Sequence, residues 1–178
     1  MPVKATFKRT KGRAYLYDLI SEILSRFIDD SGATKYKLDA NFTCEPTDKD
    51  LLSFVRQICD TAELPSPISM MAVFYLNRLK LWNPHLPVCE VNIRRLFLTA
   101  ALLASKYLED IVYRNKDWGR IAGFSLPLLN QFEVEFLARI DFNLNVTLGE
   151  FRDFAVDIID ECCHSQTEKR LLYNEIFN

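Results

Sequence analysis

The chain has 178 residues, which suits one domain or a domain with an extension. Its hydrophobic content of 49% allows a substantial core, and its formal net charge of −2 argues against a nucleic-acid-binding surface. The chain has only His85 and His164 and no CxxC spacing among its five cysteines, so a zinc site is not expected. No small-molecule cofactor is expected either.

Residues 1–13 are predicted to form a basic N-terminal arm. They contain no acidic residue and five basic ones, namely Lys4, Lys8, Arg9, Lys11 and Arg13. A solvated, disordered terminus is the prediction, and an arm for an acidic partner or for nuclear import is the alternative.

Residues 14–46 are predicted to form an N-terminal helix followed by a loop at 30–46. Apolar side chains recur at helical spacing from Leu16 to Ile28, whereas the loop collects Gly, Pro, Asn and Asp. The apolar face of the helix is wide and must be covered. The domain that follows is the expected cover, and a partner's groove is the alternative.

Residues 47–164 are predicted to hold five helices. The first runs from Thr47, the expected N-cap that faces Asp50, to about Ala62. The second begins at Ser66-Pro67, with Ser66 as the cap, and ends before Asn83-Pro84.

The third helix, Asn92–Glu109, is predicted to be central. It contains no Gly or Pro, and it carries no charge from Leu96 to Ser105. A helix that is apolar nearly all round is typically enclosed by its neighbours. The uncharged run is far shorter than the ~20 residues that a membrane span requires, so no membrane insertion is expected.

Residues 110–124 are predicted to form a connection with one short helical turn. Ser125 is the expected cap of the fourth helix, and Thr147 with Glu150 forms a full capping box for the fifth. A short C-terminal helix is predicted within residues 165–178. The predicted fold class is therefore all-α, with one helix wrapped by the others.

No enzymatic constellation stands out in the sequence. GxxxxGK[ST], GxGxxG, HExxH and GxSxG are all absent. Glu133 and Glu135 resemble a carboxylate pair, but residues two apart on a helix point about 200° away from each other. A binding or regulatory protein is favoured over an enzyme. The odd number of cysteines and the absence of a signal peptide predict reduced thiols in an intracellular protein of the nucleus, the cytoplasm or both.

Three stretches in this order and spacing resemble helices two, three and four of a cyclin box, namely SPISMMAVFYLNRL, FLTAALLASKYLED and NQFEVEFLARIDFNL. The ASKYLED element is similar to the ASKxxE/D signature of cyclins, and the resemblance covers about residues 42–160. It is closest to the PHO-type branch of phosphate-pathway cyclins and their plant and protozoan relatives. In many cyclins an Asp of helix two pairs with an Arg of helix one. Here Asn77 stands in place of the Asp and TDKDLLSF holds no Arg, which favours this branch.

The resemblance implies a single five-helix cyclin box at 47–164 that binds and activates a cyclin-dependent protein kinase. The Lys and Glu through which cyclins reach the kinase's C-helix region fall on Lys106 and Glu133. The apolar residues that flank this pair in the family match Leu103, Tyr107, Leu137, Phe142 and Leu144. For Lys106 and Glu133 the alternative is a solvated surface pair, worth only ~0–1 kcal/mol. For the five apolar residues the alternative is ordinary core.

Two features limit what the resemblance implies. No MRAIL stretch occurs, so substrate recruitment through the hydrophobic patch of cell-cycle cyclins is not expected. A cyclin-fold module that binds nucleic acid or the transcription machinery, as general transcription factor IIB does, is the alternative function. That function requires a basic helix face, against which the near-neutral charge argues.

Overall fold

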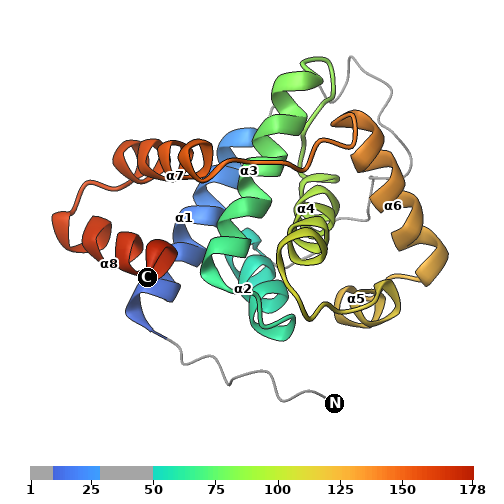
Figure 1. Cartoon of the computed structure of the whole chain (residues 1–178), viewed down its shortest axis with the longest axis horizontal. Coiled ribbons are helices and arrows are strands. Elements are labelled where there is room, and N and C mark those ends of the chain that lie inside the picture. The colour runs from blue at the N-terminus through green and yellow to red at the C-terminus, as the bar shows by residue number, and fades with distance from the viewer. Residues whose placement is uncertain (1–9, 29–49) are drawn as a thin grey trace.

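The computed structural model describes residues 10–28 and 50–178, and within these ranges the chain forms eight helices and no strand (Figure 1). The helices are α1 (Lys11–Phe27), α2 (Leu51–Thr61), α3 (Ser66–Trp82), α4 (Ile93–Leu108), α5 (Asn115–Ala122), α6 (Leu126–Arg139), α7 (Leu148–Cys162) and α8 (Gln166–Phe177). The all-α prediction is confirmed, and the five predicted core helices correspond to α2, α3, α4, α6 and α7. Among the helices in the described ranges, none has the length and apolarity needed to cross a membrane.

Helices α3 and α4 occupy the centre of the molecule. As its uncharged run predicts, α4 is buried on every side from Leu96 to Ser105. Helix α3 packs against α1, α4, α6, α7 and α8. In Figure 1, α3 stands between α1, α7 and α8 on one side and α4, α5 and α6 on the other. The predicted central helix therefore shares its position with the helix that precedes it.

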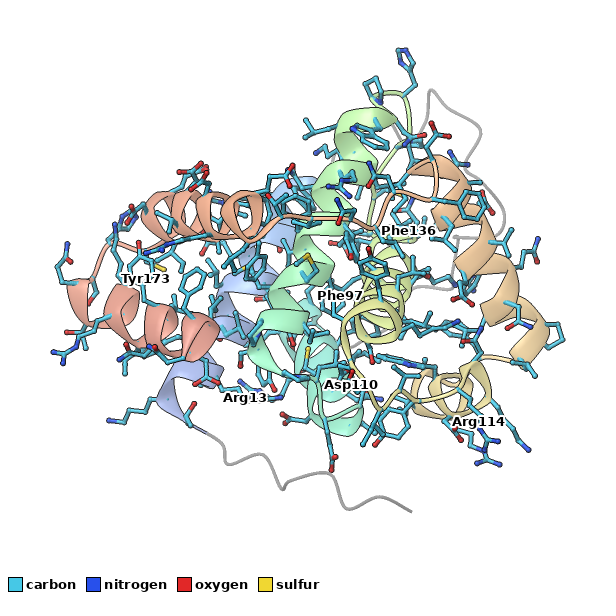
Figure 2. All side chains as sticks on the ribbon, in the orientation of Figure 1. Arg13, Phe97, Asp110, Arg114, Phe136 and Tyr173 are labelled. Atoms are coloured by element: carbon cyan, nitrogen blue, oxygen red, sulfur yellow. The ribbon has the colours of Figure 1, made fainter. Side chains whose placement is uncertain are left out.

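Large aromatic side chains fill the space around α4. Phe97 of α4 and Phe136 of α6 are fully buried, and Figure 2 shows both among the helices. Arg114, which precedes α5, points outward at the edge of the same view. The core thus holds α4 and α6 together and leaves the outer faces of α5 and α6 to solvent.

Three helix starts differ from the predicted ones. Helix α1 begins at Lys11 with Thr10 as its cap, so Lys11 and Arg13 belong to the helix and not to the basic arm. At α2 the cap is Asp50, and not the predicted Thr47, and its carboxylate accepts hydrogen bonds from Ser53. Thr47 lies outside the described residues, as do residues 1–9 and the expected loop at 30–46.

Ser66, the predicted cap of α3, makes no capping hydrogen bond. The cap position is Pro65, and the Ser66 hydroxyl instead donates to Glu175 of α8 at 2.7 Å. The start of α7 matches its prediction in full, because Thr147 and Glu150 bond to each other's backbone amides.

The connection after α4 forms a longer helix than the single turn predicted. Helix α5 has 8 residues, and its Trp118 side chain is fully buried. Gly119 permits a close approach, because a Cβ there would lie 2.6 Å from the carbonyl oxygen of Phe124. Gly123 ends the helix with φ +77, a left-handed conformation that favours glycine. Helix α5 is therefore fixed by the core.

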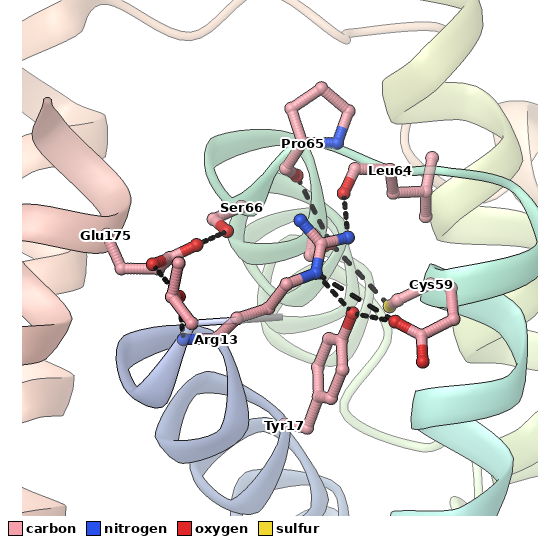
Figure 3. Close-up of polar contacts among 10 residues, drawn as sticks. Arg13, Tyr17, Cys59, Leu64, Pro65, Ser66 and Glu175 are labelled. Carbon is pink, nitrogen blue, oxygen red and sulfur yellow. Dashed lines mark hydrogen bonds and ion pairs between the residues drawn. The ribbon is translucent and has the colours of Figure 1, made fainter. Parts of the chain in front are cut away.

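The two terminal helices are joined through Glu175 of α8 (Figure 3). Its carboxylate accepts hydrogen bonds from the hydroxyl groups of Thr10, at 2.6 Å, and Ser66, at 2.7 Å. Close packing accompanies these bonds, since a Cβ on Gly12 would lie 2.9 Å from the carbonyl oxygen of Leu171. The starts of α1 and α3 are thereby tied to α8.

Candidate functional site

Lys106 and Glu133 form an ion pair between α4 and α6. Lys106 lies in the last turn of α4, where the uncharged run ends, and its Nζ donates to Oε1 of Glu133. The Lys106 side chain is 36% exposed and that of Glu133 is 14% exposed. The pair thus lies at the surface without being fully solvated, and the two charges that the resemblance singles out are in contact.

Two asparagines complete the site, and we call Lys106, Asn115, Asn130 and Glu133 the polar cluster. Asn115, the first residue of α5, donates through Nδ2 to Oε2 of Glu133 at 2.6 Å and to Oδ1 of Asn130 at 2.7 Å. Its Oδ1 accepts a hydrogen bond from Nζ of Lys106 at 3.3 Å. Each oxygen of the Glu133 carboxylate therefore has a donor from a different helix.

Sequence reasoning missed both asparagines. Asn130 lies one turn before Glu133 on α6, and this i, i+3 spacing places the two on one face. That spacing could have indicated from the sequence that Asn130 lies beside Glu133. Asn115 gave none, because its contact with Glu133 depends on how α5 packs.

The five apolar candidates lie at different depths. Leu103 is 2% exposed and belongs to the core, so it can only support the surface from beneath. Leu137 and Leu144 are partly buried against the core. Tyr107 and Phe142 are 50% and 65% exposed, and these two are available to a partner.

The turn that carries Phe142 has an uncommon backbone. Asp141 and Phe142 have φ values of 53° and 54°, which is the left-handed region that non-glycine residues rarely adopt. The amide of Phe142 donates to the carbonyl of Leu137 at 2.8 Å, which closes the end of α6. Backbone conformations of this kind persist only where the surroundings enforce them.

Side chains of α3 hold that turn in place, and we call Tyr75 and Arg78 the α3 clamp. The Arg78 guanidinium donates to the carbonyl of Asn143 at 2.6 Å and to that of Asn145 at 3.1 Å. The Tyr75 hydroxyl donates to the carbonyl of Leu144 at 2.8 Å. These bonds fix three consecutive carbonyl groups. The clamp was not predicted from the sequence, because its acceptors are backbone atoms distant along the chain.

Burial keeps the clamp in its donating state. It raises the pKa of the Tyr75 phenol well above its ordinary value, so the hydroxyl stays protonated. The guanidinium of Arg78 lies over the ring of Phe74 at 5.0 Å and near that of Trp82 at 5.7 Å. Stacking and carbonyl contacts together hold a cation that is only 9% exposed.

Apolar side chains are exposed beside the polar cluster. Tyr107 follows Lys106, and Val134, which follows Glu133, is 60% exposed. Val134 also lies one turn after Asn130, so it shares the outer face of α6. Exposed apolar groups around a few fixed polar ones are typical of a protein-binding surface. Within the described part of the chain, no group of three metal-ligating side chains is present.

Comparison with known proteins gives a family and several relatives. A family model described as Cyclin matches residues 18–144. Cyclin-U4-3 of Arabidopsis thaliana is 31% identical over 120 residues, which cover 67% of this chain and 52% of the relative. Cyclin-U2-2 of the same plant is 30% identical over 128 residues, covering 71% and 53%. Cyclin-P4-1 of Oryza sativa subsp. japonica is 38% identical over 92 residues, covering 52% and 43%.

Two facts follow from these alignments. The chain spans about half the length of the curated relatives it matches. The family match extends from within α1 to the turn after α6. It therefore contains the polar cluster, Phe142 and Leu144.

Proposed function

The chain belongs to the cyclin family, in the branch of the PHO, P and U types, and we propose that it binds and activates a cyclin-dependent protein kinase. The observation that supports this proposal is the Lys106–Glu133 ion pair, already formed at the surface between α4 and α6. A pair that is assembled before binding loses little conformational freedom when a partner docks.

The expected docking surface is the exposed last turn of α4, the outer face of α6 and the turn that follows α6. Tyr107 and Phe142 supply exposed apolar area, and the α3 clamp holds the Phe142 turn through its carbonyl groups. Leu137 and Leu144 are packed against the core and contribute only part of their side chains to this surface. A stable complex of this kind buries about 1,200 Å² or more in total.

Activation follows if this surface binds one state of the kinase more tightly than another. The mobile C-helix of a protein kinase carries the Glu that pairs with the ATP-orienting Lys. Packing of α4 and α6 against that helix would favour the arrangement in which the pair is formed. Only the difference in affinity between the two kinase states shifts their populations.

The test is co-purification of the protein with a panel of cyclin-dependent kinases, followed by an activity measurement on a generic substrate. The decisive variant carries the charge swap Lys106→Glu, Glu133→Lys. The swap retains an ion pair within the protein but reverses its polarity toward the partner. We expect the kinase affinity to fall by about 30-fold or more, which is the scale for disrupting a desolvated charge contact.

A matched control is the swap Asp160→Lys, Lys169→Asp. This pair also joins two helices, α7 and α8, at a Nζ–Oδ1 distance of 2.6 Å and lies outside the proposed surface. Circular dichroism establishes that both swapped proteins are folded. Loss of the kinase with the first swap alone supports the proposal. Equal binding by both proteins refutes the site, and no kinase bound by the wild type refutes the function.

A further inference from the structure

The Asn115 side chain makes three hydrogen bonds, and all of them lie within the polar cluster. We propose that Asn115 is a positioning residue that sets the Lys106–Glu133 pair in its binding geometry before a partner arrives; this inference rests on the proposed kinase-binding function. Neither the family resemblance nor the sequence pattern assigned it a role.

The ion pair alone does not fix its own geometry. The Lys106 side chain is long and 36% exposed, and exposed ion pairs hold their partners weakly. Without Asn115, Oε2 of Glu133 would lose its donor at 2.6 Å, and Nζ of Lys106 would lose its acceptor at 3.3 Å. The amide acts on both members at once, because it donates to the anion and accepts from the cation.

Asn115 can impose this geometry because α5 is anchored independently of the cluster. Trp118, one turn further along α5, is fully buried. Gly119 packs against the carbonyl of Phe124, where a Cβ would lie at 2.6 Å. The core therefore fixes the start of α5, and Asn115 transmits that fixed position to α4 and α6.

The same amide places Asn130. Asn115 Nδ2 donates to Oδ1 of Asn130 at 2.7 Å, which engages the acceptor end of that side chain. The Nδ2 group of Asn130 remains as a donor on an exposed residue of α6. A partner's carbonyl oxygen can accept from it, next to the remaining N–H of Lys106.

Two substitutions separate hydrogen bonding from shape. Asn115→Asp keeps the size of the side chain and an acceptor for Lys106, but it replaces the donating group with an oxygen that faces Glu133. An acidic residue in the first turn of α5 is favourable for the helix, so loss of α5 does not confound the result. Asn115→Ala removes the side chain, and Asn174→Ala on the exposed face of α8 is the matched control.

We expect both Asn115 variants to bind the kinase about tenfold more weakly at unchanged folding, the scale of one hydrogen bond to a charged group. In a Lys106→Ala background, Asn115→Ala should reduce kinase binding by less than it does alone, because the pair it positions is gone. Binding by Asn115→Asp at the wild-type level would overturn the proposal. Fully additive losses of kinase affinity in the Lys106→Ala, Asn115→Ala double variant would also overturn it.

A second readout needs no kinase. The Lys106 ammonium protons, held by Glu133 and Asn115, should give an observable NMR signal in the free protein that disappears in Asn115→Ala, which removes the amide acceptor. An unchanged signal overturns the positioning role even where no kinase binds. Failure of the wild type to bind any kinase, with the NMR difference present, refutes the kinase-binding function and leaves the positioning of the pair established.

Discussion

Two groups of polar side chains in this protein each place a cation among hydrogen-bond acceptors, but they lie at different depths. In the first, which we call the Arg13 cluster, Arg13 and Tyr17 of α1 meet Asp60 of α2 and the carbonyl of Leu64. The second is the polar cluster around Lys106. Arg13 is 4% exposed, whereas the Lys106 side chain is 36% exposed. Burial decides the role of each, because hydrogen bonds to a buried cation must all be made within the protein, whereas an exposed cation retains capacity for a partner.

The contacts of the Arg13 cluster are short and lie within the protein (Figure 3). The guanidinium donates to the Tyr17 hydroxyl and to the Leu64 carbonyl, each at 2.6 Å, and the Tyr17 hydroxyl donates to Asp60 at 2.7 Å. Burial raises the pKa of Tyr17 far above its ordinary value, and the hydrogen bond to Asp60 raises it further. These bonds attach α1 to α2 and to the link between α2 and α3.

The largest effect on stability should come from Arg13→Ala. The substitution leaves the Leu64 carbonyl and the Tyr17 hydroxyl without their donor in a buried site, at a cost of about 2–4 kcal/mol in the free energy of unfolding. Denaturant unfolding monitored by circular dichroism measures the loss. Lys11→Ala, on the exposed side of the same helix, is the control and should change little. Equal stability of the two variants would show that the Arg13 cluster does not hold α1.

A comparison of the two clusters also shows what the sequence can predict. The uncharged run of α4 predicted a buried helix, and the Thr147–Glu150 capping box predicted the start of α7, because both signals are local. Arg13 was grouped with a solvated arm, since five basic residues without an acid normally indicate exposure. Tyr17 lies one turn further along the same helix, but the Leu64 carbonyl lies beyond α2 and only the fold brings it to Arg13.

The residues of the candidate site likewise include some that the sequence identified and some that it did not. Lys106 and Glu133 were identified from the family resemblance, and the structure brings them into contact. Asn115 and Arg78 were not identified, because the partners of each lie in other parts of the chain. A polar residue that supports a site through tertiary contacts leaves no periodic pattern in its own segment.

Arg78→Met sharpens the comparison, because Arg78 is buried like Arg13 but supports the proposed docking surface. Its loss frees the carbonyls of Asn143 and Asn145 and leaves Tyr75 as the remaining member of the α3 clamp on a turn in which Phe142 has φ 54°. We expect a loss of about 1–3 kcal/mol in the free energy of unfolding. Unlike Arg13→Ala, Arg78→Met should also weaken kinase binding by the folded protein. Titration calorimetry, at a temperature below the onset of unfolding, measures that affinity. Unchanged affinity for the kinase would show that the Phe142 turn is not part of the docking surface.

The smallest effect on stability is expected for Lys106→Ala. Glu133 keeps Asn115 as a donor to its Oε2 when the lysine is removed, so its carboxylate is not left without a partner. An ion pair with a partly exposed lysine contributes about 0–1 kcal/mol, and solvent screening places this one toward the lower end. The free energy of unfolding, measured beside Arg13→Ala in the same buffer, should therefore stay within about 1 kcal/mol of the wild type. Kinase affinity should nevertheless fall, since the partner would lose the ammonium donor. A destabilisation as large as that of Arg13→Ala would mean that the pair holds α4 to α6 as part of the fold, and the distinction between a buried structural cluster and a surface binding cluster would then be lost.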